Sequence, residues 1–186
     1  MKRTLDILLT SVLLILLFIP LLIASLAIKL SSKGPILYWS ERVGQHNKNF
    51  QMPKFRTMRE ETPEVATHLL ENAEDFYTPV GSFLRKTSLD ELPQLYSILI
   101  NDMTLVGPRP ALFNQDDLIS MRLQKGVASI KPGVTGWAQV NGRDDISIKI
   151  KVDFDVDYLE RKSFFFDLYI LWLTFLKVIK SDGVSH

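Results

Sequence analysis

The chain begins with a long run of apolar residues. From Leu5 to Ile28, 19 of 24 residues are apolar and Asp6 is the only charged one. A helix needs about 20 apolar residues to cross the hydrocarbon core of a bilayer, so the length permits a membrane-spanning helix. Pro20 lies near the middle of the run, where its ring and its missing N–H kink or break a helix. The pattern predicts either a span or a re-entrant helix, which enters the membrane, breaks and returns to the same side.

Positive charge flanks this segment on both sides, at Lys2, Arg3, Lys29 and Lys33. Segments rich in lysine and arginine stay on the cytoplasmic side of a membrane, so the charges favour the same side for both ends. Proline also occurs in spanning helices, and a basic start followed by an apolar run also fits a cleaved signal peptide. A buried helix of a soluble domain is a third alternative. Residues 1–30 are therefore taken as a membrane segment, with the re-entrant form and the span both open.

The patterns in residues 31–186 are mixed, and no linker or repeat divides them. Ile36–Trp39 and Phe50–Met58 are predicted as strands, and in the second Lys54 and Arg56 share a face because strand side chains alternate. The acid-rich residues 60–75 predict a solvated loop with a short helix, and a lid is the alternative. Residues 163–180 hold many aromatic and few polar side chains, which favours a helix in the membrane interface over a core helix.

Composition narrows the function. Of 186 residues, 46% are apolar, which suffices for a folded core, and 22 basic residues nearly cancel 21 acidic ones. That balance argues against a polybasic nucleic-acid binder. The chain has no cysteine, which excludes disulfides, thiol catalysis and cysteine-ligated metals, and its three histidines lack a metal-ligand spacing.

The adjacent acids Asp90 and Glu91 are the first candidates for chemistry. Ser88 and Glu91 also fit a capping box, in which both acids merely stabilise the start of a helix. Pro93 would then fall at the fifth helical position and forfeit a hydrogen bond, whereas a helix capped by Asp90 would place it in the first turn. Structural and catalytic interpretations both stay open from these residues alone.

Two further segments suggest anion binding. Arg109 stands between Pro108 and Pro110, and a stiff backbone that presents a guanidinium suits a phosphate. An exposed arginine in a structural turn is the alternative. Residues 131–143 are punctuated by glycines that permit close approach to a ligand, and Asn141-Gly142 is a strong turn signal. This segment is predicted as a loop and turn.

Together these motifs resemble the monotopic phosphoglycosyl transferases, a bacterial sugar transferase family, along nearly the whole chain. The matching motifs, in family order, are KFRTM at 54–58, TSLDELPQL at 87–95, DM at 102–103 with VGPRP at 106–110, and PGVTGWAQVNGR at 132–143. The resemblance implies that a UDP-sugar gives its sugar 1-phosphate to undecaprenyl phosphate and releases UMP. It implies Asp90 as the nucleophile that becomes linked to the phosphosugar, Glu91 as its dyad partner, and Mg²⁺ at Asp90 and the donor diphosphate. Phosphate or substrate binding is implied for Arg109, Lys54, Arg56, Arg85 and Arg143.

The resemblance also implies a fold and a location. The expected fold is a small, helix-rich α/β catalytic domain, residues 31–186, on a re-entrant membrane helix that breaks at Pro20. Amphipathic helices, including 163–180, would lie in the interface with membrane lipids, at the cytoplasmic face of the bacterial inner membrane. No nucleic acid is expected, and later glycosyltransferases of the pathway are candidate partners.

Two residues depart from the family pattern. Ile19 precedes Pro20 where small members often have serine, and Asn101 replaces a glycine, which predicts a left-handed asparagine. Within the family, the chain looks similar to capsule and O-antigen initiators, which favours a UDP-2-acetamido-2,6-dideoxyhexose as the donor. UDP-N-acetylgalactosamine and UDP-diacetylbacillosamine are the alternatives. Two rival functions are a glycosyltransferase, which would release UDP, and a membrane-anchored scaffold for glycan-assembly enzymes, which would catalyse no reaction.

Overall fold

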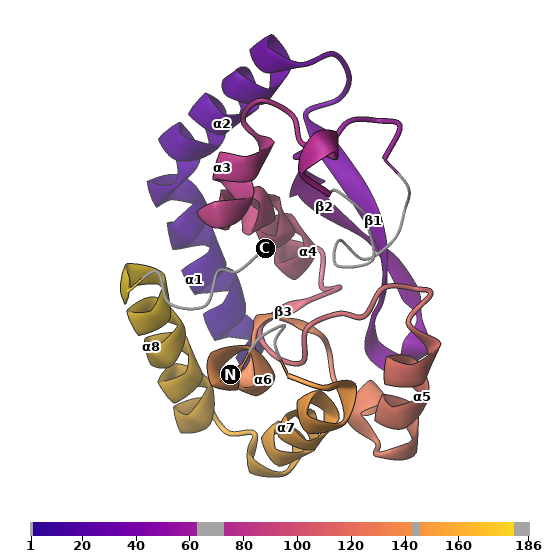
Figure 1. Ribbon diagram of the computed structural model, residues 1–186. Helices are drawn as coiled ribbons and strands as arrows, with labels where there is room; N and C mark the ends of the chain where they lie inside the picture. The colour runs from indigo at the N-terminus through magenta and orange to yellow at the C-terminus, as the bar shows by residue number, and fades with distance from the viewer. Residues whose placement is uncertain (1, 63–72, 143–145, 181–186) are drawn as a thin grey trace.

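The N-terminal apolar segment forms two helices joined at a bend. The computed structural model describes residues 2–62, 73–142 and 146–180 (Figure 1). Helix α1 (Lys2–Leu16) and helix α2 (Phe18–Ser31) meet at Leu17 with a bend of 61°. Among the described residues no single helix is long and apolar enough to cross a membrane, whereas this bent pair together has that length and composition. The predicted break is therefore present.

A β-hairpin follows, formed by β1 (Leu37–Val43) and β2 (Asn49–Phe55) with η1 (Gln45–Asn47) between them. The two strands are antiparallel, and both predicted strands are confirmed in kind. Strand β2 ends earlier than predicted, so Arg56 lies beyond it. The Arg56 N–H still donates to the Ile36 carbonyl at 2.9 Å, but the Lys54 side chain binds Glu91 whereas that of Arg56 binds Ser32. The prediction that this strand presents the two cations together is therefore wrong.

Short helices and a pair of parallel strands make up the rest of the described chain. Strands β3 (Thr104–Val106) and β4 (Gly133–Thr135) lie side by side. The fold is thus helix-rich α/β with two small sheets, as predicted. The remaining helices and 3₁₀ segments, in chain order, are η3 (Ala73–Phe76), α3 (Gly81–Lys86), η4 (Leu89–Gln94), α4 (Leu95–Leu99), α5 (Asp116–Gln124), η5 (Val127–Ser129), α6 (Trp137–Asn141), α7 (Ile148–Arg161) and α8 (Phe164–Lys180).

The glycine-punctuated segment is more ordered than predicted. It contains β4 and α6, so the prediction of a loop and turn is wrong for most of it. Asn141 ends α6 instead of starting a hairpin turn. A Cβ on Gly133 would lie 2.1 Å from the Gly107 nitrogen, and one on Gly136 would lie 2.1 Å from the Gly107 oxygen. These glycines therefore allow backbone segments to approach one another.

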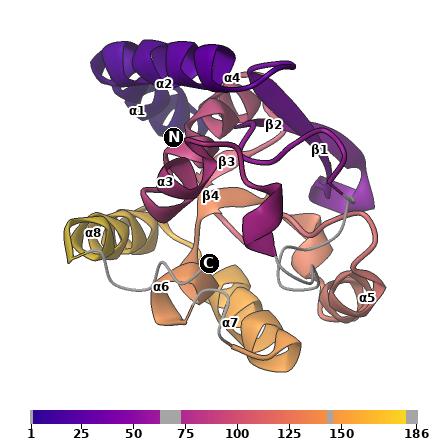
Figure 2. The ribbon, with the colours of Figure 1, turned by 45° about the horizontal axis from the view of Figure 1, so that its top comes forward.

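The helix pair is attached to the domain at both of its ends (Figure 2). Near its start, Asp6 accepts hydrogen bonds from the Thr104 hydroxyl at 2.6 Å and the Leu105 N–H at 3.3 Å. Near its end, the buried Ile28 packs in a cluster with Phe55. Both ends therefore belong to the same folded unit.

Helix α8 presents two different faces. Phe166 and Ile170 are buried in the main core, which also takes residues from β2, α4, β3, α6 and α7. Phe165, Trp172 and Phe175 are more than half exposed on the other side of the helix. The helix expected over 163–180 is thus confirmed, and only one of its faces is a core face. The core residues of the main cluster are Met52, Leu95, Ile98, Met103, Leu105, Val106, Val140, Tyr158, Phe166 and Ile170.

Candidate active site

Asp90 and Glu91 lie in the first turn of η4, directly after a left-handed turn at Ser88. The φ angle of Ser88 is 55°, and its side chain forms no capping hydrogen bond to η4. The predicted capping box is therefore wrong, since Glu91 turns toward other groups. The alternative with Asp90 as the cap is also wrong, because η4 begins at Leu89. Both acids are consequently released from a purely helix-capping role.

Two cations hold the Glu91 carboxylate. Arg109 donates to Oε1 at 2.6 Å through Nη2 and to Oε2 at 3.3 Å through Nη1. Lys54 Nζ, from the end of β2, donates to Oε1 at 2.9 Å. Burial alone would raise the pKa of Glu91, but Arg109 and Lys54 hold this pKa well below its usual range. Glu91 is therefore a negative charge that holds the Lys54 ammonium and the Arg109 guanidinium close together.

Asp90 lies in a different environment from its neighbour. Asp90 is 7% exposed, and no described residue donates a hydrogen bond to its carboxylate. Burial raises the pKa of Asp90, and the nearby charge of Glu91 acts in the same direction. The positive charges of Lys54, Arg85 and Arg109 oppose this rise. Asp90 is thus a buried carboxylate beside a cluster of cations, and it accepts no hydrogen bond from the described part of the chain.

The other predicted phosphate-binding arginines take separate places. Arg85 donates to the Thr57 hydroxyl at 3.1 Å and lies over the Tyr77 ring, close enough to act on the Asp90 charge. Arg56 is buried and donates to the Ser32 hydroxyl at 2.7 Å, so it is tied to the end of α2. Arg143 lies outside the described residues. The structure thus brings Lys54, Arg85 and Arg109 together with the two acids, and holds Arg56 away from them.

The segment that carries Arg109 is fixed by its carbonyl oxygens. It follows β3 at the carboxyl end of the parallel strand pair, the end at which open parallel sheets usually bind ligands. Proline has no N–H, so Pro108 and Pro110 offer the backbone no donors. The carbonyls accept instead: Pro108 from Gly133 N–H at 2.9 Å, Arg109 from Arg122 at 2.8 Å, Pro110 from Arg42 at 3.3 Å and Ala111 from Val43 N–H at 3.0 Å.

The donor set of this site fits Mg²⁺ in combination with phosphate oxygens. Within the part of the chain that the structure describes, no group of three or more carboxylates and histidines could hold a metal ion. Protein-bound Mg²⁺ usually takes one or two carboxylates plus substrate phosphates and water. Lys54 and Arg109 already bind the Glu91 carboxylate, whereas no described residue donates a hydrogen bond to the Asp90 oxygens. Asp90 therefore fits as one protein ligand.

Comparison with known proteins places this arrangement in a family. The model of the bacterial sugar transferase family matches residues 1–181. The chain belongs to this family. It is 42% identical to the uncharacterized sugar transferase EpsL of Bacillus subtilis over 159 residues, which cover 86% of this chain and 77% of the relative.

Other relatives have names that state an activity. The UDP-glucose:undecaprenyl-phosphate glucose-1-phosphate transferase of Caulobacter vibrioides is 41% identical over 192 residues, covering 98% of this chain and 71% of the relative. The protein of the same name from Escherichia coli is 38% identical over 185 residues, covering 95% and 40%. The chain therefore spans most of the first of these sugar transferases and less than half of the second.

The sequence of this sugar transferase did not indicate every residue that supports the site. Arg122 and Asp155 form a buried ion pair that contacts the Arg109 backbone. They stand 33 positions apart on separate helices, and neither belongs to a motif with recognisable chemistry. Only the folded chain brings them together.

Proposed function

We propose that the protein transfers a sugar 1-phosphate from a UDP-sugar to undecaprenyl phosphate and releases UMP. The observation that carries this proposal is the contrast between the two acids of η4. Asp90 is buried with no hydrogen bond from the described residues, while Glu91 is clamped by Lys54 and Arg109. A free carboxylate next to a preformed cationic cluster suits attack on a diphosphate, because the cations offset the repulsion between like charges.

The proposed reaction has two displacements at one phosphorus atom. The Asp90 carboxylate bonds to the phosphorus that bears the sugar, and the bond from that phosphorus to the bridging oxygen breaks. UMP leaves with the electron pair. A phosphate oxygen of undecaprenyl phosphate then bonds to the same phosphorus, and the Asp90 carboxylate is released. Lys54 and Arg109 offset the charge of the phosphate oxygens, and Glu91 orients both cations.

Mg²⁺ is the proposed cofactor, with Asp90 as a protein ligand and the donor diphosphate supplying further oxygens. When bound, the ion neutralises phosphate charge and favours departure of UMP. The protein groups act beside it: Lys54 and Arg109 bind phosphate oxygens, and the burial of Asp90 limits the access of water.

The proposed location is the cytoplasmic face of the bacterial inner membrane, with α1 and α2 as a re-entrant helix pair. Lys2 contacts Asp167 at 2.5 Å at one end of the pair, and Arg56 holds Ser32 at the other. Since one folded domain binds both ends, both would remain on one side of the bilayer. Undecaprenyl phosphate would then reach Asp90 from the headgroup level, and later glycosyltransferases would take up the product.

The proposed donor is a UDP-2-acetamido-2,6-dideoxyhexose, on the resemblance of the sequence to capsule and O-antigen initiators. Relatives are named for glucose and galactose transfer. A panel of donors therefore includes UDP-glucose, UDP-galactose, UDP-N-acetylgalactosamine and the dideoxy sugars, each with Mg²⁺ and undecaprenyl phosphate. The donor that releases UMP fastest identifies the sugar, and release of UDP instead would contradict phosphosugar transfer.

A covalent intermediate is the sharpest test of the mechanism. UDP-sugar and Mg²⁺ without lipid should release UMP in one stoichiometric burst, and the protein should gain the mass of one sugar phosphate on the peptide that contains Asp90. Asp90→Asn should abolish burst and adduct together, because an amide is a poor nucleophile. Adding undecaprenyl phosphate should discharge the adduct. UMP that appears only with lipid, without any adduct, would indicate direct transfer.

A further inference from the structure

A buried ion pair lies behind the segment that carries Arg109. Arg122 on α5 donates to Asp155 Oδ2 on α7 through Nε at 2.9 Å and Nη2 at 2.7 Å. Asp155 is 1% exposed and Arg122 is 8% exposed. The remaining nitrogen, Nη1, donates to the carbonyl oxygen of Arg109 at 2.8 Å. One guanidinium therefore joins two helices to the backbone of a residue whose own guanidinium binds Glu91.

A contribution to the stability of the fold does not by itself explain why a buried ion pair is present here. Removing two charges from water costs free energy, and well-packed apolar residues in their place are often equally stable or more so. Burial raises the pKa of Asp155, with Arg122 opposing the rise, so the surroundings disfavour the carboxylate charge. What an apolar pair could not supply is the hydrogen bond to the Arg109 carbonyl.

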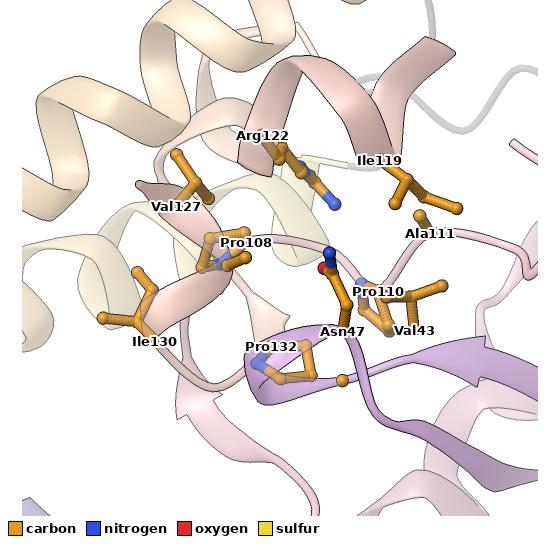
Figure 3. Close-up of a pocket in the computed structure, with 12 residues that line it drawn as sticks. Val43, Asn47, Pro108, Pro110, Ala111, Ile119, Arg122, Val127, Ile130 and Pro132 are labelled. Atoms are coloured by element: carbon orange, nitrogen blue, oxygen red, sulfur yellow. The ribbon is translucent and has the colours of Figure 1, made fainter. Parts of the chain in front are cut away.

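The space beside the pair leaves room for the Arg109 segment to shift. A cavity of about 30 Å³ lies there, lined by Arg122, Pro108, Pro110 and Ala111 among others. A space of this size holds about two water molecules, so the cavity is no substrate site. In Figure 3, Arg122 reaches from α5 toward the segment that contains the two prolines. Without the hydrogen bond from Arg122, the segment could relax into this cavity.

We propose that Arg122 and Asp155 are positioning residues, which fix the backbone at Arg109 so that its guanidinium stays aimed at Glu91 and the donor diphosphate. Asp155 orients the Arg122 guanidinium by accepting two hydrogen bonds at one oxygen. The oriented guanidinium then holds the Arg109 carbonyl in place through its third hydrogen bond. The diphosphate part of this inference rests on the proposed function, whereas the positioning of Arg109 does not.

The first test measures Arg109 itself. Asp155→Asn removes the buried charge with little change in shape, and Asp157→Asn is the matched control, since it breaks an exposed ion pair with Arg161 on the same helix. Phenylglyoxal labelling of Arg109, scored by peptide mass spectrometry against the exposed Arg59, should rise about fivefold in Asp155→Asn, the size of a modest coupling between neighbours. It should stay unchanged in Asp157→Asn. Unchanged Arg109 labelling in Asp155→Asn would overturn the proposal, and thermal unfolding of each variant reports any loss of fold.

The second test is a double-mutant cycle on kcat/KM for the UDP-sugar. Asp155→Asn should lower kcat/KM about tenfold with Arg109 present and less than about twofold in the Arg109→Ala background, because contacting residues are not additive. Equal losses in both backgrounds would mean a purely structural role and overturn the proposal. If the wild-type protein uses no UDP-sugar but Arg109 labelling rises as expected, the proposed function fails while the positioning of Arg109 stands.

Discussion

The two adjacent carboxylates of the site, those of Asp90 and Glu91, differ in their hydrogen-bond partners and therefore in their reactivity. The lone pairs of Glu91 are taken by a bidentate guanidinium and an ammonium, which makes it a poor nucleophile but a good anchor for cations. Asp90 has no such partner among the described residues. We therefore expect Glu91→Gln to slow the reaction severely while leaving some covalent adduct, whereas Asp90→Asn leaves none.

Arg109 gives a prediction that separates charge from geometry. Arg109→Ala should lower kcat/KM for the UDP-sugar by about 10- to 150-fold, which corresponds to the roughly 1.5–3 kcal/mol of a hydrogen bond to a charged group. Arg109→Lys should recover little, because an ammonium cannot reproduce the planar fork that meets both Glu91 oxygens. Steady-state kinetics with varied UDP-sugar measures both.

Arg59→Ala is a suitable control for this pair of variants, because Arg59 is exposed. It should retain the wild-type kcat/KM. If Arg109→Ala also retained it, Arg109 would serve only to close an ion pair with Glu91.

Single residues also show what the sequence could and could not predict. The motifs marked Asp90, Glu91, Lys54 and Arg109, and the fold brings all four together. Asn101 adopts the predicted left-handed backbone, with φ of 77°. The role of Arg56 could not be predicted, because it depends on where β2 ends and on a hydrogen bond from Arg56 to Ser32, the residue that follows α2.

At the scale of elements, the helix break begins upstream of the proline that causes it. Helix α1 ends at Leu16, and Pro20 is the third residue of α2. A proline ring clashes with the carbonyl four residues earlier, here that of Leu16, and its nitrogen cannot donate to it. The N–H groups of the first turn of a helix lack partners in any case, so Pro20 fits at the start of α2. The bend is thus present with Ile19 at the place where small members of the family often have serine.

Replacing this proline should change the topology. Pro20→Leu restores the missing donor and removes the clash, so α1 and α2 should merge into a straighter helix. A straight helix could not keep Lys2 at Asp167 and Ser32 at Arg56 together. Single cysteines near Lys2 and near Lys33, in a chain that has none, should both be shielded from an impermeant thiol reagent in intact cells. In Pro20→Leu the N-terminal cysteine should become labelled.

Ile19→Leu, which keeps the proline, should behave like the unchanged chain in this assay. Labelling of the N-terminal cysteine without any change at position 20 would instead indicate a spanning helix.

Elements of few residues were the hardest to predict. Strand β4 has three residues and α6 has five, too short for a hydrophobic period to identify either. The glycines of this segment indicated a loop, but Gly133 and Gly136 serve the close approach of β4 to Gly107. Composition alone does not distinguish a glycine that faces a ligand from one that faces another backbone.

For the whole molecule, exposed apolar side chains gather on three helices. Figure 1 draws α1, α2 and α8 along one side of the domain. Large exposed apolar patches mark surfaces that contact other apolar material, here by proposal a bilayer. Two polar residues of α1, Asp6 and Thr10, point the other way and are buried against the domain. The exposed apolar residues of these helices are Ile7, Leu8, Val12, Leu13, Ile15, Leu16, Phe18, Ile19, Leu22, Ile23, Leu26, Leu30, Phe164, Phe165, Leu168, Tyr169, Trp172, Phe175 and Val178.

Tryptophan fluorescence tests which side of the molecule meets the lipid. Trp172 on α8 is 55% exposed, whereas Trp137 packs against Phe166 with ring centroids 5.1 Å apart. Trp39→Phe with Trp137→Phe leaves Trp172 as the only tryptophan, and Trp39→Phe with Trp172→Phe leaves Trp137 as the matched control. In vesicles of lipids brominated on their acyl chains, Trp172 should be strongly quenched and Trp137 much less, because aromatic side chains of an interfacial helix sit at the headgroup and acyl boundary. Equal, weak quenching of both would place α8 in water and leave the bent helix pair as the only membrane contact among the described helices.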